Sequence, residues 1–119
     1  MVNEFHEKFG YTIGDKPALL KKSLLRFRAD FITEEADEFH ESVEEEDLTR
    51  MVDALGDLLY FVYGTAVALG VDMEPVFAEI HRSNMTKEVA QSKDAKGVKG
   101  PGYSPPDLSK VLFDQGGVV

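Results

Sequence analysis

The sequence predicts an all-α protein, and three observations support that prediction. Apolar side chains recur every three or four residues, as at Phe5 and Phe9, which places them on one face of a helix. Residues that begin and end helices flank these segments: Pro17 suits a first helical turn, and Gly70 suits the position just after a helix. Glycine and proline otherwise gather after Lys93, in GVKGPGYSPPD. We therefore expect helices followed by a tail.

The predicted helices extend over about residues 2–9, 17–45, 48–69 and 73–91. The acidic run EEED at 44–47 separates the second helix from the third, and Asp47 is able to cap the third. Asp72 caps the fourth helix in the same way. A length of 119 residues suits one domain, so we expect a helical core over 1–92 and an extended tail over 93–119.

The composition excludes several classes of protein. A net charge of −9 argues against binding to nucleic acid or to an anionic membrane. An anionic substrate such as a nucleotide would need a metal ion or a local basic patch. The absence of cysteine excludes disulfides, thiol catalysis and cysteine zinc sites, and it fits a cytoplasmic protein. The first ten residues, MVNEFHEKFG, lack the features of a signal peptide.

The most apolar run is Leu58–Val71, LLYFVYGTAVALGV. It falls short of the roughly 20 residues that span a bilayer, so we expect a buried helix rather than a membrane segment. A helix that is apolar on most sides needs several neighbours, more than a chain of this size supplies. The run therefore favours a homo-oligomer.

Acidic residues of the second and third predicted helices are the main candidates for chemistry. They are Glu34, Glu35 and Glu38 on the second helix and Asp53 and Asp57 on the third. Positions three or four apart share a helix face, so antiparallel packing would direct all five carboxylates into one gap. Each like-charge pair at about 5 Å costs roughly 3 kcal/mol at an effective dielectric near 20. Mg²⁺, or alternatively Mn²⁺, would neutralise such a group of oxygen ligands.

The sequence allows two other interpretations of these acids. They could form the solvated face of an acidic protein, but Phe31 precedes them and Leu55 and Leu58 flank the aspartates. Solvated faces rarely lie so deep in apolar sequence. A di-iron bundle requires Glu-x-x-His on two helices, and the nearest match here is Asp37-x-x-His40. Metal-assisted phosphate chemistry is the better hypothesis.

A second candidate is the stretch HRSNMTK at 81–87, followed by a tail that carries Lys93, Lys96 and Lys99. Its donors Arg82, Asn84 and Lys87 could hold a phosphate chain. The alternative is that cations near a helix C-terminus complement the helix dipole. The chain has neither a P-loop motif nor a G-x-G-x-x-G motif. His6, His40 and His81 are predicted to be ordinary packing or surface histidines.

Four blocks resemble a known superfamily: EEADE (34–38), DALGDLLYFVYGTAVALG (53–70), HRSNMTK (81–87) and KGPGYSPPDL (99–108). In this order they are similar to the MazG-like all-α nucleoside triphosphate pyrophosphohydrolases, specifically the small phosphoribosyl-ATP pyrophosphohydrolase-like and dUTPase/dCTPase-like members. The likeness covers roughly Phe5 to Leu112. It implies a four-helix-bundle-type fold, and a homodimer or a tetramer of dimers.

The resemblance also implies site residues and an activity. Its metal ligands would be Glu34, Glu35, Glu38 and Asp57, with Arg28 supporting the site and Asn84 and Lys87 contacting the nucleotide. One position departs from the pattern, because Ala54 stands where many members carry glutamate. Asp53 shares a face with Asp57 and could substitute for that glutamate. Tyr103, Phe5 and Phe9 are candidates for stacking on the base.

The predicted reaction is Mg²⁺-dependent hydrolysis of a nucleoside triphosphate to the monophosphate and pyrophosphate. Two or more Mg²⁺ ions would bind the triphosphate, and Glu35 or Glu34 would deprotonate the attacking water. The preferred substrate is a deoxynucleotide or non-standard nucleotide, in house-cleaning of the nucleotide pool. A phosphoribosyl-ATP pyrophosphohydrolase role in histidine biosynthesis is the alternative within the family. A non-catalytic helical oligomer that binds nucleotide or metal is the alternative outside it.

Overall fold

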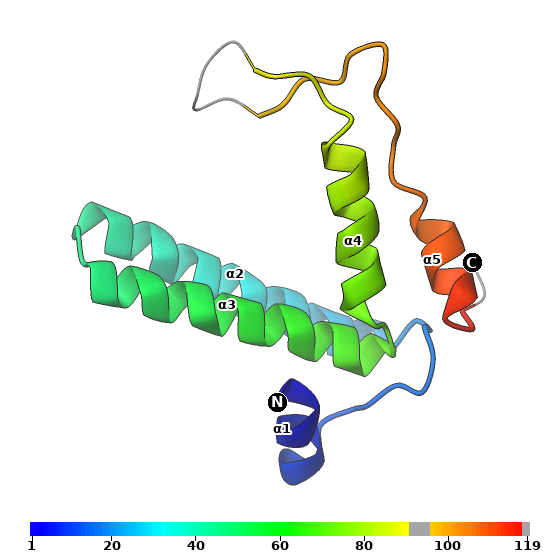
Figure 1. Ribbon diagram of the computed structural model, residues 1–119. Coiled ribbons are helices and arrows are strands. Elements are labelled where there is room, and N and C mark those ends of the chain that lie inside the picture. The colour runs from blue at the N-terminus through cyan, green and yellow to red at the C-terminus, as the bar shows by residue number, and fades with distance from the viewer. Residues whose placement is uncertain (91–95, 118–119) are drawn as a thin grey trace. The chain divides into compact units, whose positions relative to one another are not determined.

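A computed structural model describes residues 1–90 and 96–117, and it confirms the all-α class. Figure 1 shows its five helices, which are α1 (Val2–Phe9), α2 (Lys22–Glu44), α3 (Leu48–Leu69), α4 (Met73–Asn84) and α5 (Leu108–Asp114). The described residues contain no strand, only one isolated antiparallel bridge between Glu88 and Val98. The chain forms two compact units, Met1–Val71 with α1 to α3 and Asp72–Val119 with α4 and α5.

In the first unit α2 begins at Lys22, not at the predicted residue 17. The preceding segment instead pairs with the C-terminal end of α3, where the last carbonyls of a helix have no partner within the helix. The backbone N–H of Gly14 donates to Val67 (2.9 Å), and that of Ala18 donates to Leu69 (3.1 Å). This tertiary pairing holds the residues around Pro17 outside the helix.

The helix caps explain the other boundaries of α2 and α3. The helix α2 ends at Glu44, one residue before the predicted end, and α3 has its predicted bounds. The Asp47 carboxylate accepts from the backbone N–H of Arg50 at 3.1 Å, as an N-cap does. At the other end Gly70 adopts a left-handed conformation with φ of 71°. Its Cα also faces Lys16, whose carbonyl leaves no space for a Cβ.

In the second unit α4 begins as predicted but ends at Asn84, well before residue 91, which itself lies outside the described residues. The chain leaves the helix where Thr86 forms hydrogen bonds with a segment distant in sequence. Its hydroxyl donates to the Ser83 carbonyl (2.7 Å) and accepts from the backbone N–H of Ser104 (2.8 Å). The bridge between Glu88 and Val98 continues this pairing.

The segment expected to be an extended tail contains α5. Asp107 caps this helix by accepting from the backbone N–H of Lys110 at 3.1 Å. At its other end the Gln115 amide accepts from the N–H of Asp72 (2.8 Å) and donates to its carbonyl (3.0 Å). These bonds join α5 to the start of α4, on which it packs.

The first unit has a thin core. In the described residues the buried apolar side chains are Ala54, Ala66, Ala68 and Val76, and the first three of these lie on α3. Large side chains remain exposed on the paired helices, including Phe27, Val52 and Leu59. By length and composition α3 could cross a membrane, although core helices of water-soluble proteins satisfy the same criteria. Here α3 packs along α2 and against α1.

Candidate functional site

Three layers of facing residues lie along the antiparallel pair of α2 and α3 in the first unit. From the start of α2 onward, the facing pairs are Arg28 with Gly64, Phe31 with Phe61, and Glu35 with Asp57. Consecutive layers are about one helical turn apart, so roughly 10 Å along α2 separates the Arg28 and Glu35 layers. The layers along this helix pair are thus a guanidinium, then aromatic rings, then carboxylates.

Glu35 is the central group of the carboxylate layer. Its Oε2 is buried and has no hydrogen-bond partner among the described residues. Burial, followed by the nearby charges of Glu38, Asp57 and Glu34, raises the pKa of Glu35 to about 7. A buried carboxylate without a partner is costly, so this oxygen is available to a proton or a cation.

Asp57 responds to the same crowding from α3. Burial raises the pKa of Asp57, and the charges of Asp53 and Glu38 add to the increase. Glu34 and Asp53 are exposed at the edge of the group. The five predicted carboxylates are therefore electrostatic neighbours across one helix pair.

These carboxylates fit a divalent cation by charge and by ligand type. Among residues 1–90 and 96–117 no three acidic or histidine side chains already meet closely enough to hold a metal together. Binding of a divalent cation would draw like charges inward. The orphaned Oε2 of Glu35 and the crowding around Asp57 both indicate where it would bind.

The departure at Ala54 also has a structural context. Ala54 is 2 % exposed, so a glutamate there would need space that the α2–α3 packing does not leave. Asp53 lies next to it in sequence, is exposed, and acts electrostatically on Asp57. A negative charge is thus retained beside Asp57 from the neighbouring position.

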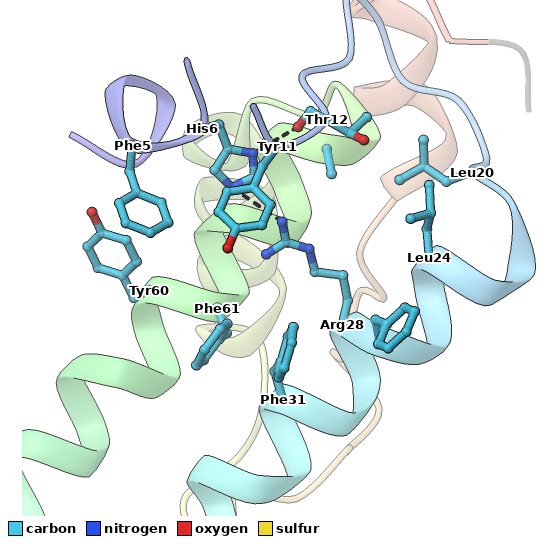
Figure 2. Close-up of a pocket in the computed structure, with 12 residues that line it drawn as sticks. Phe5, His6, Tyr11, Thr12, Leu20, Leu24, Arg28, Phe31, Tyr60 and Phe61 are labelled. Carbon is cyan, nitrogen blue, oxygen red and sulfur yellow. Dashed lines mark hydrogen bonds between the residues drawn. The ribbon is translucent and has the colours of Figure 1, made fainter. Parts of the chain in front are cut away.

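A pocket of about 420 Å³ adjoins the aromatic layer (Figure 2). Its walls are apolar and aromatic, with one guanidinium and one imidazole among them. The lining residues are Phe5, His6, Tyr11, Thr12, Leu20, Leu24, Phe27, Arg28, Phe31, Tyr60, Phe61 and Ala68. They come from α1, from the loop that follows it, and from the facing ends of α2 and α3. The dimensions and the rings suit a flat organic group.

Arg28 is held in this pocket by His6, which is 2 % exposed. The Nη2 of Arg28 lies 3.4 Å from Nε2 of His6, and the His6 Nδ1 lies 2.8 Å from the Thr12 carbonyl. Figure 2 shows the guanidinium reaching past Tyr11 towards the imidazole. Gly64 makes room for it, because a Cβ there would lie 2.8 Å from Nη1 and 3.0 Å from the His6 Nε2.

The second predicted group, at 81–87, lies in the second unit. The Arg82 guanidinium donates to both Glu79 oxygens, at 2.7 to 3.0 Å, and also to Ser104 and to the Pro105 carbonyl, each at 3.1 Å. Hydrogen bonding to Arg82 lowers the pKa of Glu79. Arg82 thus has a structural role, whatever else it contacts.

Three other predicted substrate contacts are in the same unit. Asn84 is exposed at the end of α4, and Lys87 is half-buried beside Gly97. The Lys99 ammonium lies 5.2 Å from the centre of the Tyr103 ring. That Asn84, Lys87 and Tyr103 contact a nucleotide stays a prediction. Lys93, in the predicted basic tail, lies outside the described residues.

Sequence reasoning placed Arg28 near the site but missed the pocket around it. His6 packs in the interior, as one of the two predicted kinds of histidine does, and its contact with Arg28 is what the sequence does not indicate. Two signals were present: an arginine within the apolar stripe of α2, and Gly64 in the middle of α3. Neither residue type shows that Arg28 and Gly64 face each other, because that depends on the register of α2 against α3.

Comparison with known proteins identifies the family of this chain. The sequence model of the phosphoribosyl-ATP pyrophosphohydrolase family matches residues 2–84, which include the whole carboxylate group and Arg28. A protein described as uncharacterized, from Acanthamoeba polyphaga mimivirus, is 32% identical over 77 residues. That match covers 61% of this chain and 31% of the viral protein, so the chain spans about a third of the relative's length. The chain belongs to the phosphoribosyl-ATP pyrophosphohydrolase family, within the MazG-like all-α superfamily.

Proposed function

We propose that this protein hydrolyses a nucleoside triphosphate, a deoxynucleotide or a non-standard nucleotide, to the monophosphate and pyrophosphate. Family membership supports a pyrophosphohydrolase activity on a nucleotide-like substrate. The observation that carries the finer proposal is the crowded carboxylate layer around Glu35, one turn from an aromatic pocket on the same helix pair. Carboxylates suit the metal-bound triphosphate, and the pocket suits the base.

The carboxylates would hold Mg²⁺, for which Mn²⁺ could substitute. Glu35, Glu38 and Asp57 are the central ligands in this proposal, and Glu34 and Asp53 complete the group from its edge. A bound Mg²⁺ would neutralise phosphate charge and assist the attacking water. Glu35 is also the candidate to accept the water proton, directly or through the metal, because its Oε2 has no hydrogen-bond partner among the described residues.

The base would enter the aromatic pocket. Of the stacking candidates from the sequence, Phe5 lines this pocket, and its ring stacks on Tyr11 with centroids 5.6 Å apart. Phe9 is 55 % exposed and is not among the lining residues. The helix pair would thus position the base on one side of the Phe31–Phe61 layer and the phosphates on the other.

A homodimer, or a tetramer of dimers, is part of the proposal. The exposed Phe27, Val52 and Leu59 on α2 and α3 are apolar surface that a second copy could cover. Light scattering should then give a mass of about two or four times 13.2 kDa. A mass that stays at one chain across concentrations would contradict this part. A cytoplasmic location without nucleic-acid or membrane partners completes the proposal.

Two competing functions have specific support. The matching family is described by its action on phosphoribosyl-ATP, so that substrate is the first alternative. The second is a protein that binds nucleotide and metal without turnover, and it is favoured by the absence, among the described residues, of three acidic or histidine side chains already arranged around one metal position. Calorimetry would reveal the second as Mg²⁺-dependent nucleotide binding with no pyrophosphate released.

The deciding experiment measures pyrophosphate release from a panel of nucleoside and deoxynucleoside triphosphates and phosphoribosyl-ATP, with and without Mg²⁺. We expect release that depends on Mg²⁺ and is lost in Glu38→Ala. The matched control is Glu44→Gln, which removes an exposed charge from the same helix outside the carboxylate group. Release that survives Glu38→Ala at the wild-type rate would exclude the carboxylate group as the catalytic site.

A further inference from the structure

Arg28 is a half-buried cation whose charge is not paired with any carboxylate that the structure describes. In residues 1–90 and 96–117, no carboxylate forms an ion pair with it, and the hydrogen bond that it makes is to the neutral-type acceptor Nε2 of His6. Burial lowers the pKa of Arg28. A guanidinium has five N–H donors, so donors remain for a ligand in the pocket that it lines.

The surroundings of Arg28 fix its direction. Because the Thr12 carbonyl can only accept, Nδ1 of His6 is the nitrogen that carries the proton, and Nε2 is left to accept from Arg28. Gly64 lets the guanidinium lie directly against α3. Tyr11 lies beside it, with the guanidinium carbon 5.9 Å from the ring centre. One edge of the fork is therefore anchored, and the group is pre-organised.

The ligand group that suits Arg28 is the edge of a base rather than a phosphate. Six aromatic rings line the pocket, and these favour a flat, weakly hydrated group over a fully charged phosphate. The carboxylate layer, where a metal would bring the phosphates, lies about two helical turns from Arg28, roughly 10 Å. A sugar and a base together bridge a gap of this size.

We infer that Arg28, oriented by His6, selects bases that present a carbonyl oxygen beside a ring-nitrogen acceptor. The O6 and N7 atoms of a 6-oxopurine match a guanidinium fork with two parallel hydrogen bonds. Adenine places an amino donor where the oxygen would be, so one of these bonds is replaced by a donor–donor contact. This inference rests on the proposed function, because it concerns the base of that same substrate. His6 acts here as a positioning residue.

The test compares ITP with ATP, which differ in the 6-oxo and 6-amino groups. We expect the wild-type kcat/KM to favour ITP by at least about tenfold, the lower part of the range for a good bidentate contact. Arg28→Met should abolish this preference, mainly by raising KM for ITP. Arg26→Gln is the matched control, because it removes an exposed arginine from the same helix, and it should keep the preference.

Two further variants test positioning without removing the arginine. Gly64→Ala adds a Cβ that would displace the guanidinium, and His6→Ala removes its anchor. Both should reduce the ITP preference several-fold, and circular dichroism would confirm that they fold. A positioning role predicts this loss of selectivity, whereas a merely structural role would lower the rates with ITP and ATP equally.

Three results would overturn the inference: no ITP preference in the wild type, an equal loss with both nucleotides in Arg28→Met, or a preference that survives in Arg28→Met. An equal loss of kcat/KM with ITP and ATP would mean that Arg28 contacts the sugar or the phosphates, which both nucleotides share. Calorimetry of the Glu38→Ala variant separates this inference from the proposed function. Tighter binding of ITP than ATP, without turnover in any variant, would support base selection and contradict hydrolysis. Turnover without a preference between ITP and ATP would support hydrolysis and contradict base selection.

Discussion

Two groups of charged side chains, Arg82 with its partners in the second unit and the Arg28 and Glu35 layers in the first, differ in how far their hydrogen-bonding groups are satisfied. In the second unit Arg82 is saturated by Glu79, Ser104 and Pro105, and Lys110 pairs with Asp114. In the first unit, Glu35 has an orphaned oxygen, and no described carboxylate pairs with Arg28. Satisfied charges hold segments together, whereas unsatisfied buried ones cost free energy unless a ligand meets them. The contrast supports the proposal that the ligands bind along α2 and α3.

The largest expected effect is on catalysis, from Glu35→Gln. The amide keeps the shape of the side chain but cannot accept a proton or bind a cation well. We expect kcat for pyrophosphate release to fall by at least about 10²-fold, the lower bound for loss of a general base. Steady-state kinetics on the best substrate would measure this. A loss as small as that in the Glu44→Gln control would show that Glu35 is not part of the catalytic group.

The second prediction concerns stability against pH in the absence of divalent metal. Burial raises the pKa of Glu35 from 4.5 to about 7, so the folded chain binds this proton more tightly than the unfolded chain does. The contribution of Glu35 is therefore most favourable below about pH 4.5, is lost as the pH rises to about 7, and stays constant above that. Asp57 shifts in the same direction.

Thermal denaturation measures this dependence. Over the window from about pH 4.5 to 7, we expect the Tm of Glu35→Gln to rise relative to that of the wild type. Added Mg²⁺ should raise the wild-type Tm more at pH 8 than at pH 5, because protons compete with the cation. Parallel wild-type and Glu35→Gln curves across this range would contradict the raised pKa.

A pair of glycines in α3 gives the third prediction. An alanine Cβ at Gly56 would have nothing within 4 Å, whereas at Gly64 it would meet Arg28 and His6. Gly56→Ala should therefore raise stability by up to about 1 kcal/mol through helix propensity, and Gly64→Ala should gain less or lose stability. Urea unfolding of the two variants would compare them. A loss at Gly56 would instead indicate that a second chain packs on that face.

The smallest effect is expected in the second unit. Glu79→Ala and Arg82→Ala both break the Glu79–Arg82 pair, and each also removes contacts with the segment around Ser104 to Asp107, so we expect both to lower Tm. Substrate KM measured on both variants extends the comparison. A rise in KM confined to Arg82→Ala would show that Arg82 also contacts the nucleotide, as the sequence predicted. Equal KM values would restrict its role to holding the second unit together.

Sequence patterns predicted the local features of the fold. Helical spacing and capping residues located α1 and α3 with their observed bounds, because capping is decided within a few residues. The start of α2 was predicted five residues too early, since pairing of Gly14 and Ala18 with the end of α3 depends on residues some fifty positions away. The end of α4 was missed for the same reason, through the contact of Thr86 with Ser104.

By itself the sequence determined the helical class and the family, and it predicted the five carboxylates as a site, because all of these depend on residue types at short, regular spacings. Tertiary structure alone decided which groups face one another. The register of α2 on α3 sets Arg28 against Gly64 and Glu35 against Asp57, and burial there makes Glu35 the most perturbed acid of the five. Desolvation depends on everything packed around a group, and no spacing along one chain segment encodes it.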